Sequence, residues 1–158
     1  MKSIAPCLWF DGAAEEAAEF YVSLLPDSHI DRVMRSPADN PSTAAGEVLT
    51  VEFTLMGKEY FALNGGPAFK FNEAVSIMVY CENQEEVDRL WSALTDGGSE
   101  VQCGWLKDRW GLCWQIVPTR LIELLNDPDR DRARRSQEAM MEMVKIDIAK
   151  LEQAADGK

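Results

Sequence analysis

Histidine is nearly absent from this chain of 158 residues, because His29 is the only one. A single imidazole cannot build a histidine-rich metal centre, and a Ser/His/Asp catalytic set would depend on that one side chain. Basic residues are also scarce, with 16 Lys and Arg against 27 Asp and Glu, for a formal net charge of -11. A chain this acidic is repelled by phosphate groups, so we expect neither a nucleic-acid partner nor a membrane partner.

Long apolar runs and paired cysteines are missing as well. No stretch approaches the roughly 18 apolar residues of a membrane-spanning helix, and the segment 1–6 lacks the apolar core of a signal peptide. None of the four cysteines forms a CxxC pair, so no zinc knuckle or thioredoxin-type motif is indicated. We therefore expect a cytoplasmic protein whose thiols are reduced and mostly buried. The four are Cys7, Cys81, Cys103 and Cys113.

The two halves of the chain repeat one order of predicted elements, strand–helix–strand–strand–strand. The strands are predicted from period-two or short apolar runs and the helices from apolar residues at helical spacing. A shift of 70 residues places Glu15 on Glu85 and Pro6 on Ser76 (85 − 15 = 70). In the first half the predicted elements are Ile4–Phe10, Ala13–Leu25, Ile30–Met34, Glu47–Leu55 and Glu59–Leu63. In the second half they are Val75–Cys81, Asn83–Leu94, Val101–Trp105, Lys107–Trp110 and Leu112–Val117.

The tail is predicted to be helical. Leu121–Leu125 forms a short apolar turn, and Arg130–Ala155 has the pattern of one long amphipathic helix. The apolar stripe of that helix must be buried, either against its own domain or against a partner subunit.

Several blocks of the sequence, spread over nearly the whole chain, resemble a known family. They are Pro6–Phe10, Ala17–Tyr21, Leu63–Pro67, Phe69–Phe71, Gln84–Asp88, Gln102–Asp108, Trp114–Pro118, Asn126–Pro128 and Lys145–Ile148. On these residues the chain is similar to the PhnB-like proteins of the vicinal-oxygen-chelate (glyoxalase/bleomycin-resistance/dioxygenase) superfamily. These proteins also carry the description 3-demethylubiquinone-9 3-methyltransferase.

The resemblance implies an α+β fold in which paired βαβββ modules form a U-shaped, glyoxalase-like cup, followed by C-terminal helices. It implies a glyoxalase-like domain over residues 1–120, with modules at about 1–66 and 73–118, and a helical extension over 121–158. It also implies a homodimer.

In the metal-dependent relatives, four side chains inside the cup hold a divalent ion. The resemblance places these positions at Pro6, Ala62, Ser76 and Gln115. Pro6 and Ala62 have no side-chain donor atom, and the other two offer only neutral oxygens, whereas divalent ions prefer carboxylate, imidazole or thiolate ligands. We therefore expect no metal and no other cofactor.

Alternation along the strands gives a set of candidate ligand-pocket residues, with a tryptophan near the rim. This set is mainly apolar with a few hydrogen-bonding groups, as is typical of small-molecule pockets. Alternatively, the cup is filled by its own side chains, and the protein is structural or an interaction module. The candidates are Leu8, Phe10, Tyr60, Asn64, Ser76, Met78, Trp105, Cys113 and Gln115.

Groups that could carry out chemistry are few. Cys113 is the one candidate nucleophile, but no nearby base is identifiable. Glu52 and Glu59 could act as acids or bases, and the segment 107–109 (Lys-Asp-Arg) either orients a polar ligand or is simply solvated.

These observations favour a metal-free protein that binds a small organic molecule in the cup. One alternative is a metal-dependent lyase, isomerase or dioxygenase with non-standard ligands. The methyltransferase named in the family description is disfavoured, because no glycine-rich turn joins a strand to a helix as in nucleotide-type cofactor folds.

Overall fold

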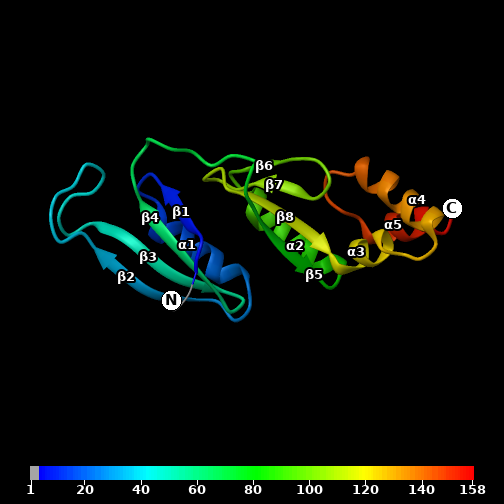
Figure 1. The fold of residues 1–158 in the computed structure, drawn as a ribbon, viewed down its shortest axis with the longest axis horizontal. Coiled ribbons are helices and arrows are strands. Elements are labelled where there is room, and N and C mark those ends of the chain that lie inside the picture. The colour runs from blue at the N-terminus through cyan, green and yellow to red at the C-terminus, as the bar shows by residue number, and fades with distance from the viewer. Residues whose placement is uncertain (1–3) are drawn as a thin grey trace. The chain divides into compact units, whose positions relative to one another are not determined.

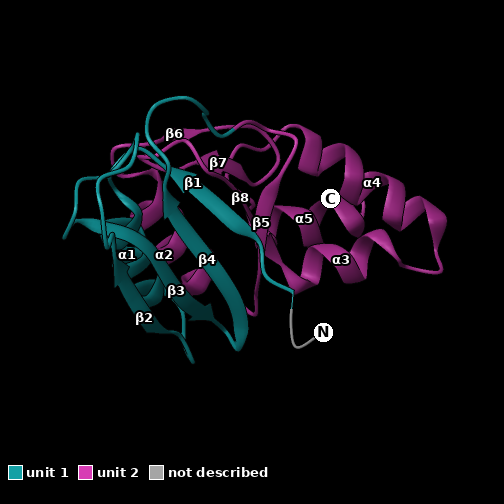
Figure 2. Cartoon of the chain, turned by 60° about the vertical axis from the view of Figure 1, so that its left-hand side comes forward, with its two compact units in different colours: residues 1–71 teal, residues 72–158 magenta. Residues whose placement is uncertain are grey.

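The structure, a computed structural model, describes residues 4–158 and divides the chain into two compact units. The first unit ends at Phe71 and the second runs from Asn72 to Lys158 (Figure 2). Each unit contains one βαβββ module with its own four-stranded sheet (Figure 1). The boundary falls between the two predicted modules, and the C-terminal helices belong to the second unit. The association of the modules into one cup stays a prediction.

The first unit has one helix on a mixed sheet with the strand order β1-β4-β3-β2. The edge strand β1 runs parallel to β4, and the other pairs are antiparallel. The elements are β1 (Cys7–Phe10), α1 (Ala14–Leu24), β2 (His29–Arg35), β3 (Val48–Leu55) and β4 (Lys58–Asn64).

Helix α1 covers one face of this sheet. Its small residues Ala14, Ala17 and Ala18 are buried, which lets the helix approach the strands closely, and its Tyr21 ring lies 6.4 Å from the ring of Phe53 on β3. Because neighbours two residues apart on a strand share a face, this contact identifies the helix-covered face of the whole sheet.

The second unit repeats this arrangement with the strand order β5-β8-β7-β6. Helix α2 begins after Asn83, whose side chain accepts a hydrogen bond from the Glu86 amide, as expected of a helix N-cap. The elements are β5 (Ser76–Cys81), α2 (Gln84–Thr95), β6 (Ser99–Glu100), β7 (Trp105–Lys107) and β8 (Cys113–Pro118). Burial of Val79, Trp114 and Ile116 marks the sheet face that α2 covers, so Trp114 is a core residue as predicted.

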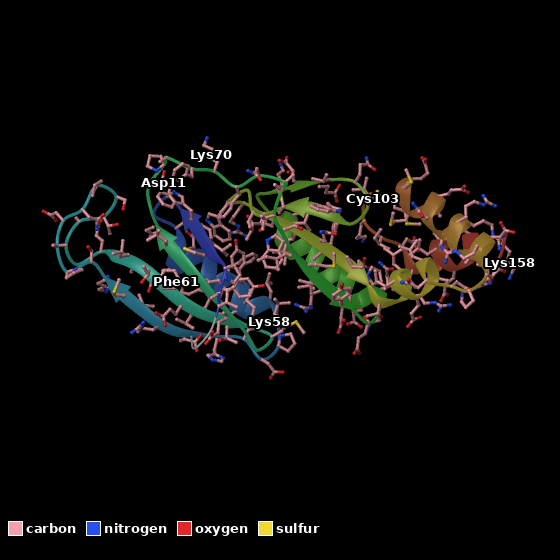
Figure 3. The ribbon with its side chains drawn as sticks, in the orientation of Figure 1. Asp11, Lys58, Phe61, Lys70, Cys103 and Lys158 are labelled. Atoms are coloured by element: carbon pink, nitrogen blue, oxygen red, sulfur yellow. The ribbon has the colours of Figure 1, made fainter. Side chains whose placement is uncertain are left out.

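The strand predicted over Val101–Trp105 is wrong, because β7 begins only at Trp105. Cys103, which lies in the loop that precedes β7 (Figure 3), has a φ of 59°. The next residue, Gly104, has a φ of 82°. This left-handed backbone cannot continue a strand.

The tail forms three helices: α3 (Thr119–Leu125), α4 (Arg130–Met141) and α5 (Ile148–Ala155). The single helix expected over Arg130–Ala155 is therefore wrong. The chain leaves the helical path after Met141, and α5 begins after its N-cap residue Asp147, whose carboxylate accepts a hydrogen bond from the Lys150 amide. These helices bury an apolar cluster at the carboxyl end of β8, formed by Val117, Leu121, Leu124, Ile146, Leu151 and Ala155.

Two further findings concern the described residues 4–158. None of their helices is both long and apolar enough to span a membrane. All four cysteines are free thiols.

Candidate functional site

The candidate site is the face of the second sheet that α2 does not cover, which we call the open face. Strand register places five predicted pocket residues on it in two neighbouring rows. One row runs Ser76–Cys113 and ends at Lys107 on β7, and the other runs Met78–Gln115–Trp105. Residues directly opposite each other on paired strands lie within side-chain reach, so this face brings the five together.

At the centre of the open face, two polar side chains are hydrogen-bonded. The Gln115 amide donates from Nε2 to Ser76 Oγ at 2.8 Å. Within residues 4–158 this is the one side-chain hydrogen bond of either residue, so the Ser76 hydroxyl proton and Gln115 Oε1 are available to a ligand. Met78 beside them is 42% exposed, and Trp105 is half-buried. The centre therefore offers one donor and one acceptor between apolar side chains.

Cys113 is not an activated nucleophile. Its side chain is buried, and burial raises the pKa of the thiol, with only partial opposition from the ammonium of Lys107. Lys107 in turn forms an ion pair with Glu73, which raises the pKa of the lysine and lowers that of the glutamate. A thiol held in its neutral form is a poor nucleophile, so this row is better suited to binding than to covalent chemistry.

Asp108 has a structural position that the sequence did not reveal. It is 3% exposed, and its carboxylate accepts hydrogen bonds from the amides of Trp110 and Leu112, both at 3.0 Å, and from Trp114 Nε1 at 2.9 Å. It therefore holds the β7–β8 hairpin together from inside and is not a solvated hairpin residue. Arg109 next to it lies 3.6 Å from the carboxylate of Asp96.

In the first unit, four predicted pocket residues lie on the face that α1 covers, which is the other side of the sheet from the one expected. They are Leu8, Phe10, Tyr60 and Asn64, and Tyr60 is placed there by its pairing with Phe53, whose ring stacks on the Tyr60 ring at 5.5 Å. Leu8 and Phe10 are buried on the face that α1 covers, since Leu8 pairs with Ala62, which pairs with Val51, two residues from Phe53. Both sets of alternate residues on β1 are apolar. Alternation therefore predicted a strand but not which of its two faces the helix covers.

Asn64 belongs to the same helix-covered face. Its Oδ1 accepts a hydrogen bond from the Ala14 amide at 2.9 Å, and its Nδ2 donates to the Val48 carbonyl at 2.9 Å. It supplies from β4 the cap that Ala13 cannot give α1.

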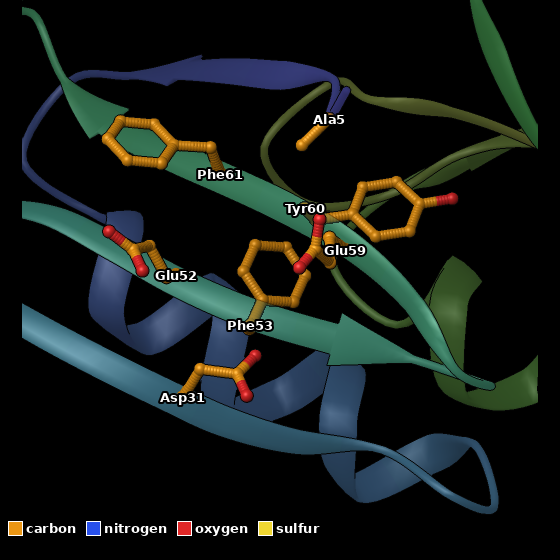
Figure 4. Close-up of a pocket in the computed structure, with 7 residues that line it drawn as sticks. All are labelled: Ala5, Asp31, Glu52, Phe53, Glu59, Tyr60 and Phe61. Atoms are coloured by element: carbon orange, nitrogen blue, oxygen red, sulfur yellow. The ribbon is translucent and has the colours of Figure 1, made fainter. Parts of the chain in front are cut away.

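A pocket of about 470 Å³ lies on the sheet of the first unit (Figure 4). Asp31 in it is 3.0 Å from His29 Nε2 and accepts a hydrogen bond from Thr54 at 2.8 Å, while Glu52 is paired with Arg32. The predicted residue Tyr60 contributes to the lining, and burial raises the pKa of its phenol. The lining residues are Ala5, Asp31, Glu52, Phe53, Glu59, Tyr60 and Phe61.

The sequence profile of the family described as 3-demethylubiquinone-9 3-methyltransferase matches residues 2–117. The chain belongs to this family. The predicted resemblance to PhnB-like proteins is thereby confirmed, and residues 118–158 lie beyond the family match.

Solved structures agree with this membership. The PhnB protein from Bacillus cereus is 32% identical to the chain, and the match covers 74% of this chain and 99% of that one, with a TM-score of 0.68. A protein from Pseudomonas aeruginosa, 23% identical, matches over 75% of this chain and 98% of its own, with a TM-score of 0.59, and supports the fold alone. No curated protein matches the chain. The α+β class with two βαβββ modules is confirmed.

The positions that would hold a metal in this superfamily do not fit an ion here. Pro6 and Ala62 have no donor atom, and Ala62 lies on the helix-covered face of its sheet. Ser76 and Gln115 are hydrogen-bonded to each other, and both are neutral. Among residues 4–158 there is also no group of three or more His, Cys, Asp or Glu that could hold a metal ion.

The family description names a methyltransferase, but the turn from β5 to α2 in the second unit does not fit a nucleotide-type cofactor. The turn from β5 to α2 contains no glycine, and it is closed by the side chains of Asn83 and Glu86, which accept from the Glu86 and Glu82 amides at 2.9 and 2.8 Å. These bonds use backbone donors that a cofactor would need.

Proposed function

We propose that this chain binds a small organic molecule on the open face of its second sheet. The observation that supports this most strongly is the hydrogen-bonded pair Ser76–Gln115, in which Gln115 lies between Met78 and Trp105 and Ser76 lies beside Met78 on β5. Small-molecule sites combine a mainly apolar lining with a few well-placed polar groups, and this face has that composition.

The pair also indicates what the ligand offers. The Ser76 hydroxyl can donate and Gln115 Oε1 can accept, so a ligand with an acceptor and a donor on one edge satisfies both. Carboxamides and protonated carboxylic acids have such an edge. An aromatic or aliphatic body would then contact Met78 and Trp105.

Thermal-shift measurements and calorimetric titration with the carboxamides benzamide and phenylacetamide test the proposal. Benzoate, which can only accept hydrogen bonds, is the comparison compound and should bind more weakly. The Gln115→Met variant keeps the length of the side chain and removes its polar atoms, and Ser76→Ala removes the hydroxyl. Loss of a hydrogen bond worth about 1–2 kcal/mol should weaken binding about 5- to 30-fold. Glu59→Gln, in the first unit, serves as the matched control and should bind like the wild type. The proposal is refuted if neither carboxamide binds, or if Gln115→Met binds them unchanged.

We also propose that the chain forms a homodimer through a sheet edge. Strand β5 is an edge strand of its sheet and carries Met78 and Tyr80, which are 42% and 55% exposed. Edge strands with exposed large side chains favour pairing with another strand. Sedimentation equilibrium at micromolar concentration should give twice the chain mass, and the mass of one chain would contradict the proposal.

A cytoplasmic location is the third part of the proposal. The four free thiols suit a reducing compartment. Fractionation of the source cells with an antibody to the chain would test it, and recovery outside the cytoplasmic fraction would exclude it.

A further inference from the structure

Residues 143–148 comprise most of the connection between α4 and α5 together with the first residue of α5, and they lie beyond residues 2–117, which match the family profile. We propose that this segment is a strap that fixes the turn 102–104 and so sets the position of Trp105. Gln84 and Gly104 are then positioning residues for the ligand site. The role in ligand recognition rests on the proposed function, whereas the strap itself can be tested without a ligand.

One end of the strap is bonded to the turn before β7. The amides of Cys103 and Gly104 donate to the carbonyls of Met143 and Val144 at 2.8 and 2.7 Å. On its other side, the Gly104 carbonyl accepts from the Ile116 amide at 2.8 Å. The turn is thus held between the strap and β8.

Gly104 permits this close approach. Its φ is 82°, and a Cβ at this position would lie 2.9 Å from the Ile116 carbonyl oxygen and 3.0 Å from Cγ1 of Ile146 in the strap. A side chain here would force the strap away from β8, so the glycine is required both by its backbone conformation and by the space available.

The other end of the strap is bonded to α2. The Gln84 side chain donates from Nε2 to the Ile146 carbonyl at 3.1 Å and accepts from the Ile148 amide at 2.9 Å. Lys145 adds an ion pair with Asp88 of α2 at 2.6 Å. The side-chain amide of Gln84 therefore bonds to the strap through one donor and one acceptor, as the backbone of a neighbouring β-strand would.

Trp105 follows the strapped turn directly and pairs with Gln115 across β7 and β8. When the strap is bonded, the residues on both sides of the turn are fixed, and the indole of Trp105 has a defined position beside Gln115. Local opening of the strap would release the turn, because few other contacts of the backbone at 102–104 replace these bonds. The C-terminal extension thus holds Trp105, on one side of the ligand site, in position. The part of the chain that matches the family profile does not contain the strap that does this.

The full-length Gln84→Ala variant tests the strap by amide hydrogen exchange. The amides of Cys103 and Gly104 should exchange about 5- to 30-fold faster, which corresponds to one or two lost hydrogen bonds. The indole N–H resonance of Trp105 should shift or broaden. Gln84→Met, which keeps the length of the side chain and removes both polar atoms, should produce the same two changes as Gln84→Ala. Glu85→Gln, an exposed neighbour on α2, is the matched control and should leave both unchanged.

Each outcome decides a separate question. Unchanged exchange at Cys103 and Gly104 in Gln84→Ala and in Lys145→Ala overturns the strap. Faster exchange with an unaltered Trp105 indole resonance overturns the positioning role. A benzamide affinity that falls in Gln84→Ala supports the link to recognition, and an unaltered affinity overturns it. Failure of the wild type to bind benzamide counts against the proposed function and leaves the exchange result valid.

Discussion

Asp108→Ala removes a buried carboxylate that accepts three hydrogen bonds within one hairpin. Two of the donors, the Leu112 amide and the Trp114 indole, belong to residues that are almost fully buried. A buried donor left without an acceptor costs about 1–3 kcal/mol, and the third donor, in half-buried Trp110, can turn to water at a smaller cost. We therefore expect the variant to lose about 3–5 kcal/mol of unfolding free energy.

Urea titration followed by far-ultraviolet circular dichroism and tryptophan fluorescence measures this loss. The matched control is Asp96→Ala, because Asp96 is 81% exposed and its contact with Arg109 is a surface ion pair. That control should stay within about 0.5 kcal/mol of the wild type. A loss below about 1 kcal/mol in Asp108→Ala would show that water or a rearranged hairpin satisfies the buried donors, and the reasoning would fail.

Three further predictions follow from the second unit. Burial raises the pKa of the Cys81 thiol to about 11, so iodoacetamide at pH 8 should label it only after unfolding, and mass spectrometry that finds it labelled in the native protein would contradict this. Gly98→Ala would place a Cβ 2.1 Å from the Lys107 carbonyl oxygen, and we expect a loss of about 1–3 kcal/mol by urea titration, with no loss as the contrary result. The hydrogen bond from Lys145 lowers the pKa of Asp88, so its stabilising effect is present above the unfolded pKa and is lost as the pH falls through the folded one. Carboxyl-carbon NMR titration of Asp88 should give a pKa below 3.8, and Lys145→Ala should raise it.

The order of elements was predictable because each module repeats the same apolar periods. The period alone does not say which alternate set of a strand faces the helix. On β5, the polar Ser76 belongs to one alternate set of residues, and Val79 and Cys81 belong to the other. The sequence therefore indicated which set faces the helix. On β1, Cys7 and Trp9 are as apolar as Leu8 and Phe10, and only the packing of α1 decides between them.

The interruption between α4 and α5 could not be predicted from the sequence for a related reason. Met140, Val144, Ile148 and Leu151 keep helical spacing across it, so periodicity predicts one helix. What ends α4 is distant in sequence: the amides at 103–104 and the side chain of Gln84 bond to the backbone between 143 and 148. The sequence places Asp108 in a segment that either orients a polar ligand or is solvated, because no neighbouring residue indicates that three donors meet at its carboxylate.

The Gln84 amide has a consequence for comparisons among sequences of this family. The Gln84 side chain bonds to the backbone of the strap, so this residue has that role only in proteins that contain the strap. We therefore expect sequences with a helical extension after β8 to keep Gln at the position of Gln84, together with Gly at the position of Gly104. Sequences that end near residue 117 should vary freely at the first position. The residue at the position of Gln84, at the start of α2, would then indicate whether a relative contains the strap.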